Sequence, residues 1–209
     1  MKLYLDPKQP NVRRVLMFMR EKEIEVPTQE MNLRSGEHRT AEFRAKNPLG
    51  QVPVLELDDG TYVSESMSIC RYLEEIYPER PLLGTTSAER AHIDMWQRRM
   101  EFGLFIPAVE YGHHTQAFFA QRFRQFPDWG MSNRDVIEST YDRLEQELAL
   151  RPFIYGETFT IADITCFNGV QLADLWEIGI QNRSNLAKWR ERVGTRKSAV
   201  VVQYEPMTT

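Results

Sequence analysis

Cysteine is scarce in this chain, which has only Cys70 and Cys166 among its 209 residues. Two cysteines cannot form the disulfide framework of a small secreted domain, and there is no Cys-x-x-Cys pair for dithiol chemistry. Both lie in apolar patterns of helical period, and free cysteine is commonly buried in such positions. We therefore expect two buried, unreactive thiols.

The chain also lacks an excess of positive charge, a long apolar run and a leader-like start. Its formal net charge is -4, which disfavours nucleic-acid binding, and no window reaches the ~18–20 apolar residues of a membrane span. The N-terminal MKLYLDPKQP has no apolar stretch typical of a signal peptide. The pair His113-His114 has no Cys or acidic partner at metal-ligand spacing. The composition predicts a cytoplasmic protein without metal, nucleic-acid or membrane partners.

Short strands and helices alternate in the first part of the sequence. We expect strands at 2–5, 24–33, 52–57 and 61–63, and helices at 12–19, 40–46 and 66–77. Asp58-Asp59-Gly60 is a hairpin turn signal between the last two strands. The order βαβαββα predicts a sheet with both parallel and antiparallel pairs. We assign residues 1–80 to an α/β domain.

The rest of the sequence has helical patterns and no convincing strand until its very end. Pro78–Gly84 is read as a linker, and Thr86-x-x-Glu89 as a capping box that opens a long helix, which Pro107 should end or kink. Further helices are expected at 135–150, from Thr160 onward, and at 186–193. Residues 86–209 are therefore predicted to form an all-helical domain.

Pro53 lies inside an apolar run that otherwise reads as a buried strand. Proline cannot donate a hydrogen bond to a sheet ladder, so it belongs at edges, first positions or bulges. A cis Val52–Pro53 bond would turn the Val52 peptide group outward, where a ligand with its own peptide backbone can pair with it as an added strand. The alternative is an ordinary trans proline on an edge strand.

Glu65 and Ser66 precede the helix that follows the hairpin. Serine is a good N-cap, and the free N–H groups of a helix N-terminus bind carboxylate or phosphate. Glu65 can accept from an ammonium group, so the pair suits a ligand with both α-amino and α-carboxyl groups. The alternative is a capping serine beside a surface glutamate.

Four segments in order resemble the cytosolic glutathione transferases over nearly the whole chain. They are NPLGQVP, SESMSICRYLEE, FTIADI and LAKWRERVGTRKSAV. The resemblance implies a thioredoxin-like first domain with a cis-proline, an all-helical second domain, and a homodimer. It also implies that Val52, beside Pro53, pairs with the cysteinyl backbone of glutathione. By the same resemblance Glu65 and Ser66 hold the γ-glutamyl end, while His38 and Gln51 hold the glycine carboxylate.

The family activates the glutathione thiol with a Tyr, Ser or Cys just after the first strand, and this chain departs from that pattern. No hydroxyl or thiol lies between Asp6 and Arg14, and Gln9 stands where many bacterial relatives have Ser. Asn11 and Gln9 carry amide groups that can donate to a thiolate. We predict Asn11 as the donor, at the start of the first helix, with Gln9 second. The alternative is that Asn11 caps that helix.

The predicted activity is addition of the glutathione thiolate to an apolar electrophile, as in detoxification. The electrophile is expected in the cleft between the two domains, with Phe102, Leu104 and Phe105 as candidate walls and core packing as their default role. One rival is a glutathione-dependent disulfide or peroxide reductase. Another is a non-enzymatic protein of this fold that binds glutathione and partners.

Overall fold

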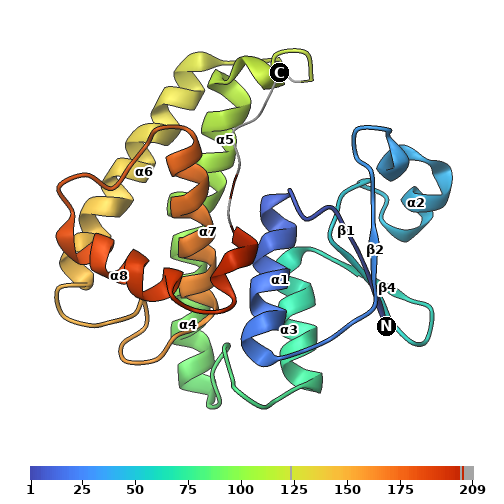
Figure 1. The fold of residues 1–209 in the computed structure, drawn as a ribbon, viewed down its shortest axis with the longest axis horizontal. Helices are drawn as coiled ribbons and strands as arrows, with labels where there is room; N and C mark the ends of the chain where they lie inside the picture. Colours follow the sequence, from blue (N-terminus) through green and yellow to red (C-terminus); the bar gives the residue numbers. More distant parts are fainter. Residues whose placement is uncertain (123, 203, 205–209) are drawn as a thin grey trace. The chain divides into compact units, whose positions relative to one another are not determined.

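The computed structural model describes residues 1–122, 124–202 and 204 of the chain. It divides into two units, Met1–Pro81 and Leu82–Thr209, whose elements are labelled in Figure 1. None of the helices in the described residues is both long and apolar enough to span a membrane.

The first unit follows the predicted element order. Its main elements are β1 (Lys2–Leu5), α1 (Pro10–Lys22), β2 (Thr28–Glu30), α2 (Ala41–Lys46), β3 (Val54–Glu56), β4 (Tyr62–Ser64) and α3 (Ser66–Ile76), with a 3-10 turn at Glu37–Arg39. The strands form one sheet in the order β2-β1-β3-β4. β1 pairs in parallel with β2 and antiparallel with β3, so the predicted mixture of pairings is confirmed.

Alternation along the strands gives the sheet two buried faces. Leu3 pairs with Leu55, and both are buried. Tyr4 and Val54, the next pair, point to the opposite face and form a cluster with Phe43 of α2. α1 and α3 pack against each other and lie side by side in Figure 1. This pairing brings the N-terminal ends of two helices into one part of the unit.

The strand around Pro53 begins later than predicted. β3 starts at Val54, so Pro53 precedes the strand and takes no ladder position, which agrees with its missing N–H. The Val52–Pro53 peptide bond is cis, as predicted.

The second unit is helical. Its main elements are α4 (Ser87–Met100), a π-helical turn (Glu101–Phe105), α5 (Ile106–Thr115), α6 (Pro127–Glu147), α7 (Ile161–Leu175) and α8 (Ser184–Gly194), with 3-10 turns at Ala117–Phe119 and Ala199–Val202. α6 begins eight residues before the predicted start at 135, because Pro127 suits a first helical turn although the residues after it lack an apolar stripe. The capping box predicted at Thr86 is present, and Thr160, the predicted start of a helix, forms a second one with Asp163.

Pro107 does not end the helical run, because α4, the π-helical turn and α5 follow one another without a break. It lies at the start of α5, and the π-helical turn before it carries the chain on, with Ile106 N–H bonded to the Glu101 carbonyl. Pro107 has no N–H to give the Gly103 carbonyl, and the Thr140 hydroxyl of α6 donates to that oxygen at 2.8 Å instead. A side chain from the neighbouring helix thus replaces the missing backbone bond.

Both cysteines are buried, as predicted. Desolvation by burial raises the pKa of the Cys70 thiol to about 12 and raises that of Cys166 well above its usual value. Neither thiol is ionised at neutral pH, which agrees with two unreactive groups.

Candidate active site

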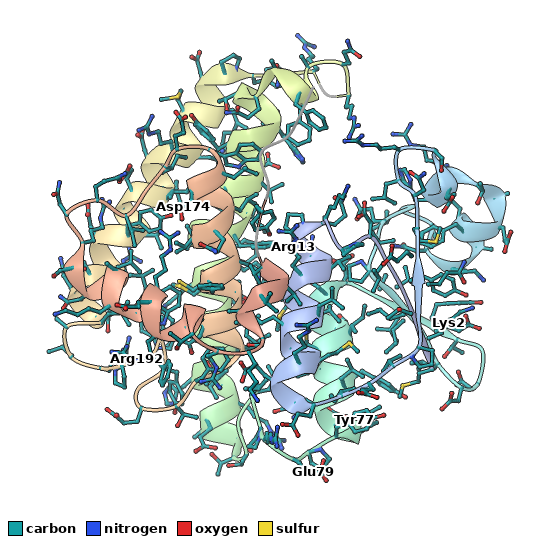
Figure 2. All side chains as sticks on the ribbon, viewed as in Figure 1. Lys2, Arg13, Tyr77, Glu79, Asp174 and Arg192 are labelled. Atoms are coloured by element: carbon teal, nitrogen blue, oxygen red, sulfur yellow. The ribbon has the colours of Figure 1, made fainter. Side chains whose placement is uncertain are left out.

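The loop between β1 and α1 is held by its own hydrogen bonds. The Asp6 carboxylate accepts from Lys8 N at 3.0 Å and from Gln9 Nε2 at 2.9 Å. Arg13, labelled in Figure 2, donates from Nε to the Pro7 carbonyl at 2.8 Å. The Gln9 amide group is therefore turned toward Asp6, which reduces its suitability as a donor to a bound thiolate.

Asn11 lies in the first turn of α1 and is exposed. The N-cap residue is Gln9, with Pro10 at the first helical position, so the alternative that Asn11 caps the helix is wrong. Its side-chain Oδ1 accepts a hydrogen bond from Ser66 Oγ at 3.1 Å. The structure thus joins the predicted thiol activator directly to a predicted glutathione-binding residue.

Ser66 differs from its predicted role as the N-cap of α3. Glu65 is the N-cap residue, and Ser66 is the first residue inside the helix, with 4% of its surface exposed. The Ser66 hydroxyl faces α1, where it accepts from Arg14 Nη1 at 3.0 Å in addition to donating to Asn11. A tertiary contact has taken the hydroxyl that a local cap would have used. The backbone N–H groups of the first turn of α3 still form an anion-binding helix end.

Glu65 has an unusual backbone conformation, with φ 67° and ψ 118°. Positive φ is costly for a residue with a Cβ, on the order of 1–3 kcal/mol, and such residues gather at functional sites. The Glu65 side chain is exposed, and its carboxylate has no partner among the described residues. The carboxylate is therefore available to a cationic ligand group beside the end of α3.

Val52 is half-buried, and its side chain packs against the cluster around Tyr4. Within the described part of the chain, its backbone N–H and C=O make no hydrogen bond. The preceding residue, Gln51, is exposed, and its carbonyl accepts from Asn47 Nδ2 at 2.9 Å, which fixes the loop. Unpaired donor and acceptor groups on one residue are what an added strand requires.

His38, which the resemblance places at the glycine carboxylate, is half-buried. Its Nε2 accepts from Arg39 Nε at 3.3 Å, and its Nδ1 is buried without a partner among the described residues. Desolvation, with smaller effects from Arg39 and Arg44, lowers the pKa of the imidazole below its usual value. A neutral ring whose donor nitrogen is enclosed is a weak carboxylate ligand, so Arg39 is a potential contributor that sequence reasoning missed.

The hydroxyl group of Tyr4, in β1, is not available to a glutathione thiol. Tyr4 Oη donates to Glu56 Oε2 at 2.6 Å, and its ring packs edge-on against Phe43. This orientation supports the prediction that the activating donor lies in the loop or helix after β1.

The candidate electrophile walls separate into two groups. Leu104 is 0% exposed and Phe105 is 2% exposed, so both belong to the core of the helical unit. Their proposed role as substrate walls needs correction, because side chains enclosed by protein cannot contact a ligand. Phe102 is 53% exposed, with the Arg98 guanidinium 4.1 Å from its ring centre. Of the three, Phe102 remains a candidate.

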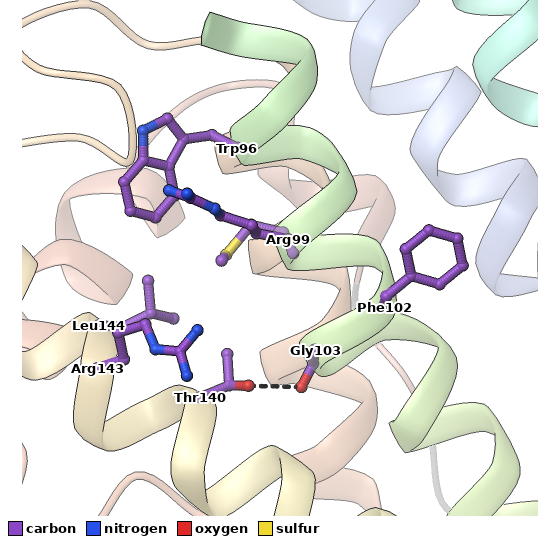
Figure 3. A pocket seen from close by; sticks show the side chains of 8 residues that line it. Trp96, Arg99, Phe102, Gly103, Thr140, Arg143 and Leu144 are labelled. Atoms are coloured by element: carbon purple, nitrogen blue, oxygen red, sulfur yellow. Dashed lines mark hydrogen bonds between the residues drawn. The ribbon is translucent and has the colours of Figure 1, made fainter.

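A cavity of about 280 Å³ lies between α4 and α6 in the helical unit. It is lined by Trp96, Arg99, Met100, Phe102, Gly103, Thr140, Arg143 and Leu144. Figure 3 shows the Phe102 ring directed away from Trp96 and Arg143, at the edge of this group. The sequence signal for this cavity is the i, i+4 spacing of Trp96 and Met100 on α4 and of Thr140 and Leu144 on α6.

No group of three His, Cys, Asp or Glu side chains in residues 1–122, 124–202 and 204 is arranged to hold a metal ion.

Comparisons with known proteins agree with this architecture. The family model for "Glutathione S-transferase, N-terminal domain" matches residues 10–76, and that for "Glutathione S-transferase, C-terminal domain" matches residues 117–192. Glutathione S-transferase 2 of Saccharomyces cerevisiae is 33% identical over 201 residues, which are 94% of this chain and 86% of that protein.

A solved structure is similar over the same extent. The crystal structure of a glutathione S-transferase domain-containing protein from Marinobacter aquaeolei VT8 has a TM-score of 0.90 and 37% identity, over 95% of this chain and 100% of that one. The chain therefore belongs to the glutathione S-transferase family, and its fold is the predicted one, a thioredoxin-like unit followed by a helical unit. Elongation factor 1-gamma 1 of Oryza sativa subsp. japonica is also 32% identical over 134 residues, 30% of that protein's length.

Proposed function

We propose that the protein is a glutathione transferase that activates the glutathione thiol with Asn11 and adds the thiolate to an apolar electrophile. The supporting observation is the hydrogen bond between Ser66 Oγ and Asn11 Oδ1, which joins the N-terminal turns of α1 and α3. One turn offers an amide donor, and the other offers the N–H groups of a helix end. Both belong to the same unit as the unpaired backbone of Val52.

Glutathione would bind through its backbone and its two charged ends. Val52 N–H and C=O pair with the cysteinyl residue as an added strand. Glu65 accepts from the γ-glutamyl ammonium group, and the first turn of α3, from Ser66, binds the adjacent carboxylate. Gln51 and Arg39 serve the glycine carboxylate, and the neutral ring of His38, whose donor nitrogen is enclosed, contributes less. The site thus reads the peptide-like ligand along its length.

Thiol activation follows from hydrogen bonding and the α1 dipole. A free thiol with a pKa of about 8.5 is roughly 3% ionised at pH 7, and a shift to about 7 raises that share to about half. The Asn11 amide stabilises the thiolate by donating to sulfur, and the positive end of α1 acts in the same direction. The sulfur lone pair then forms a bond to the electrophilic carbon. In a substitution, the bond from that carbon to the leaving group breaks and its electron pair goes to the leaving group. In a conjugate addition, the π electron pair moves to the acceptor atom.

The test is an Asn11→Ala variant titrated with bound glutathione by thiolate ultraviolet absorbance. Loss of a donor to an anion costs about 1.5–3 kcal/mol, so the thiol pKa should rise by about one to two units, with little change in glutathione affinity. Gln9→Ala is the matched control and should shift the pKa less, because its amide is bonded to Asp6. An unchanged titration for Asn11→Ala beside a shifted one for Gln9→Ala would transfer the role to Gln9.

The similarity to elongation factor 1-gamma supports a second candidate, a non-enzymatic member that uses this fold to bind partners. A glutathione-dependent reductase is a third, and with Cys70 and Cys166 buried it would draw its thiols from glutathione. Assays with a chlorinated aromatic electrophile and with a glutathione mixed disulfide separate the three. Conjugation supports the transferase, and disulfide reduction without conjugation supports the reductase. The absence of both activities supports the binding protein.

A homodimer acting in cytoplasmic detoxification extends this proposal. It is supported by the family resemblance, and light scattering of the purified chain would measure its mass. A monomer at micromolar concentration would contradict the dimer.

A further inference from the structure

We propose that Arg14 is a positioning residue that fixes, through Ser66, which end of the Asn11 side chain faces the glutathione sulfur. This inference rests on the proposed function, in which the Asn11 amide nitrogen donates to the thiolate. It adds to that function a buried residue on α1 that touches neither substrate.

The three side chains form a chain of hydrogen bonds between α1 and α3. Arg14 is 1% exposed and donates from Nη1 to Ser66 Oγ at 3.0 Å. Ser66 Oγ donates to Asn11 Oδ1 at 3.1 Å. α1 and α3 pack side by side, as Figure 1 shows, so each of these contacts lies inside one unit.

The chemistry of Arg14 determines the donor-to-acceptor direction of these hydrogen bonds. A guanidinium group has donors and no acceptor, so Ser66 Oγ must accept from Arg14. The single hydroxyl proton of Ser66 is then free to be donated onward, and it needs an acceptor. Asn11 meets this need with Oδ1 and not with its NH₂ group. The amide nitrogen is therefore directed away from Ser66.

The orientation of the Asn11 amide determines whether a hydrogen-bond donor or an acceptor faces the glutathione sulfur. Asn11 is exposed, and without Arg14 its amide could rotate so that Nδ2 donates to Ser66. The oxygen would then face the sulfur and repel a thiolate. Arg14 thus selects the stabilising orientation over the destabilising one.

The experiment combines Arg14→Met with Asn11→Ala in a double-mutant cycle, read by the absorbance titration of bound glutathione. Arg14→Met should raise the thiol pKa by about one unit, and Arg14→Lys, which keeps a donor without an acceptor, should restore most of the shift. In the Asn11→Ala background, Arg14→Met should add no further shift, because its action passes through the amide.

Lys22→Met is the matched control. Lys22 is another buried cation on α1, at 6% exposed, and donates to Glu74 of α3 at 2.6 Å. Its replacement should lower the midpoint of urea unfolding without moving the thiol pKa. A shift from Lys22→Met equal to that from Arg14→Met would show that general loosening of α1 explains both, and would overturn the proposal. So would an undiminished Arg14→Met shift in the Asn11→Ala background, which would indicate a direct effect of the buried charge.

A second measurement does not depend on glutathione or on the folding of Arg14→Met. In the ligand-free parent, nuclear Overhauser effects from the Asn11 amide protons to the Ser66 β-protons should be weak, because Nδ2 points away. Strong effects would overturn the assigned orientation. If these effects are weak but the parent neither binds nor ionises glutathione, the hydrogen-bond chain stands and the proposed function fails.

Discussion

Asp163 gives the sharpest pH test of the helical unit. Its carboxylate is buried and accepts from Ile154 N, Thr160 N and Trp189 Nε1, each at 2.9 Å. Desolvation outweighs these hydrogen bonds and raises the Asp163 pKa from its ordinary 3.8 to about 6. The folded protein therefore holds this proton more tightly than the unfolded chain does.

The sign of the pH dependence follows from linkage. Between about pH 4 and pH 6 the folded state binds more protons at Asp163 than the unfolded state, so raising the pH lowers the free energy of unfolding. The contribution is complete below the unfolded pKa and is lost as the pH rises through about 6. Two pKa units at about 1.4 kcal/mol each give a change of about 3 kcal/mol.

The perturbation is Asp163→Asn, which removes the titration. Urea unfolding of parent and variant is compared from pH 4 to pH 8. Above about pH 6 the variant should be less stable by about 1–3 kcal/mol, because an amide nitrogen then faces backbone or indole donors, and toward pH 4 this difference should grow by up to about 3 kcal/mol. The parent's advantage should shrink as the pH rises to about 6 and then stay constant. An advantage that is flat from pH 4 to pH 7 would show that Asp163 titrates normally and would refute the reasoning.

Glu145 supplies a control of opposite sign. The Glu145 pKa is lowered from its ordinary value. Desolvation alone would raise it, but hydrogen bonds from the backbone N–H groups of Leu186 and Asn185, at the start of α8, outweigh that effect. The stability that Glu145 contributes is present above its unfolded pKa and is lost as the pH falls. Glu145→Gln should therefore cost less at low pH, whereas the Asp163→Asn cost should be largest there.

Substitutions at three further positions test the site and the helices around it. Glu65→Gly should weaken glutathione binding about tenfold or more in calorimetry, because a charge-assisted contact is lost. The same variant should raise the urea midpoint of unfolding, because glycine adopts the positive φ at this position without strain. Glu65→Ala should weaken binding to the same extent without raising that midpoint. Thr140→Val should lower the free energy of unfolding by about 1–2 kcal/mol because the Gly103 carbonyl loses its donor, and an unchanged urea midpoint would argue against that bond. Phe102→Ala should raise KM for an apolar electrophile and leave that for glutathione unchanged, whereas equal KM values in parent and variant would remove Phe102 from the substrate site.

The element order and the capping boxes could be predicted because they depend on neighbours in the sequence. Thr86 and Thr160 meet acidic partners three residues later, and that spacing is visible in the chain. The partner of Ser66 was not predictable in this way. Its hydroxyl bonds to Arg14, 52 residues earlier, and only the packing of α1 on α3 brings them together.

Which of Phe102, Leu104 and Phe105 are enclosed could not be predicted from the sequence for a similar reason. Their helix was read with one regular period, but the π-helical turn shifts the phase of the faces that follow. The close approach of Leu104 also depends on Gly169 of α7, where an added Cβ would lie 2.6 Å from Leu104 Cγ. A glycine on a partner helix carries no sequence signal of the residue it accommodates.

The bond from Thr140 to Gly103 has a consequence for how the helical unit opens. Because Pro107 lacks an N–H, the regular backbone ladder from α4 to α5 is interrupted there, and the oxygen left over is held by α6. Amide protons of α5 should therefore exchange with solvent in step with those of α6, while those of α4 open separately. Thr140→Val should speed exchange in α5 before it does so in α4. The continuous helical run of α4 and α5 thus consists of two segments that open separately, and the Thr140 side chain of α6 holds the carbonyl at their junction.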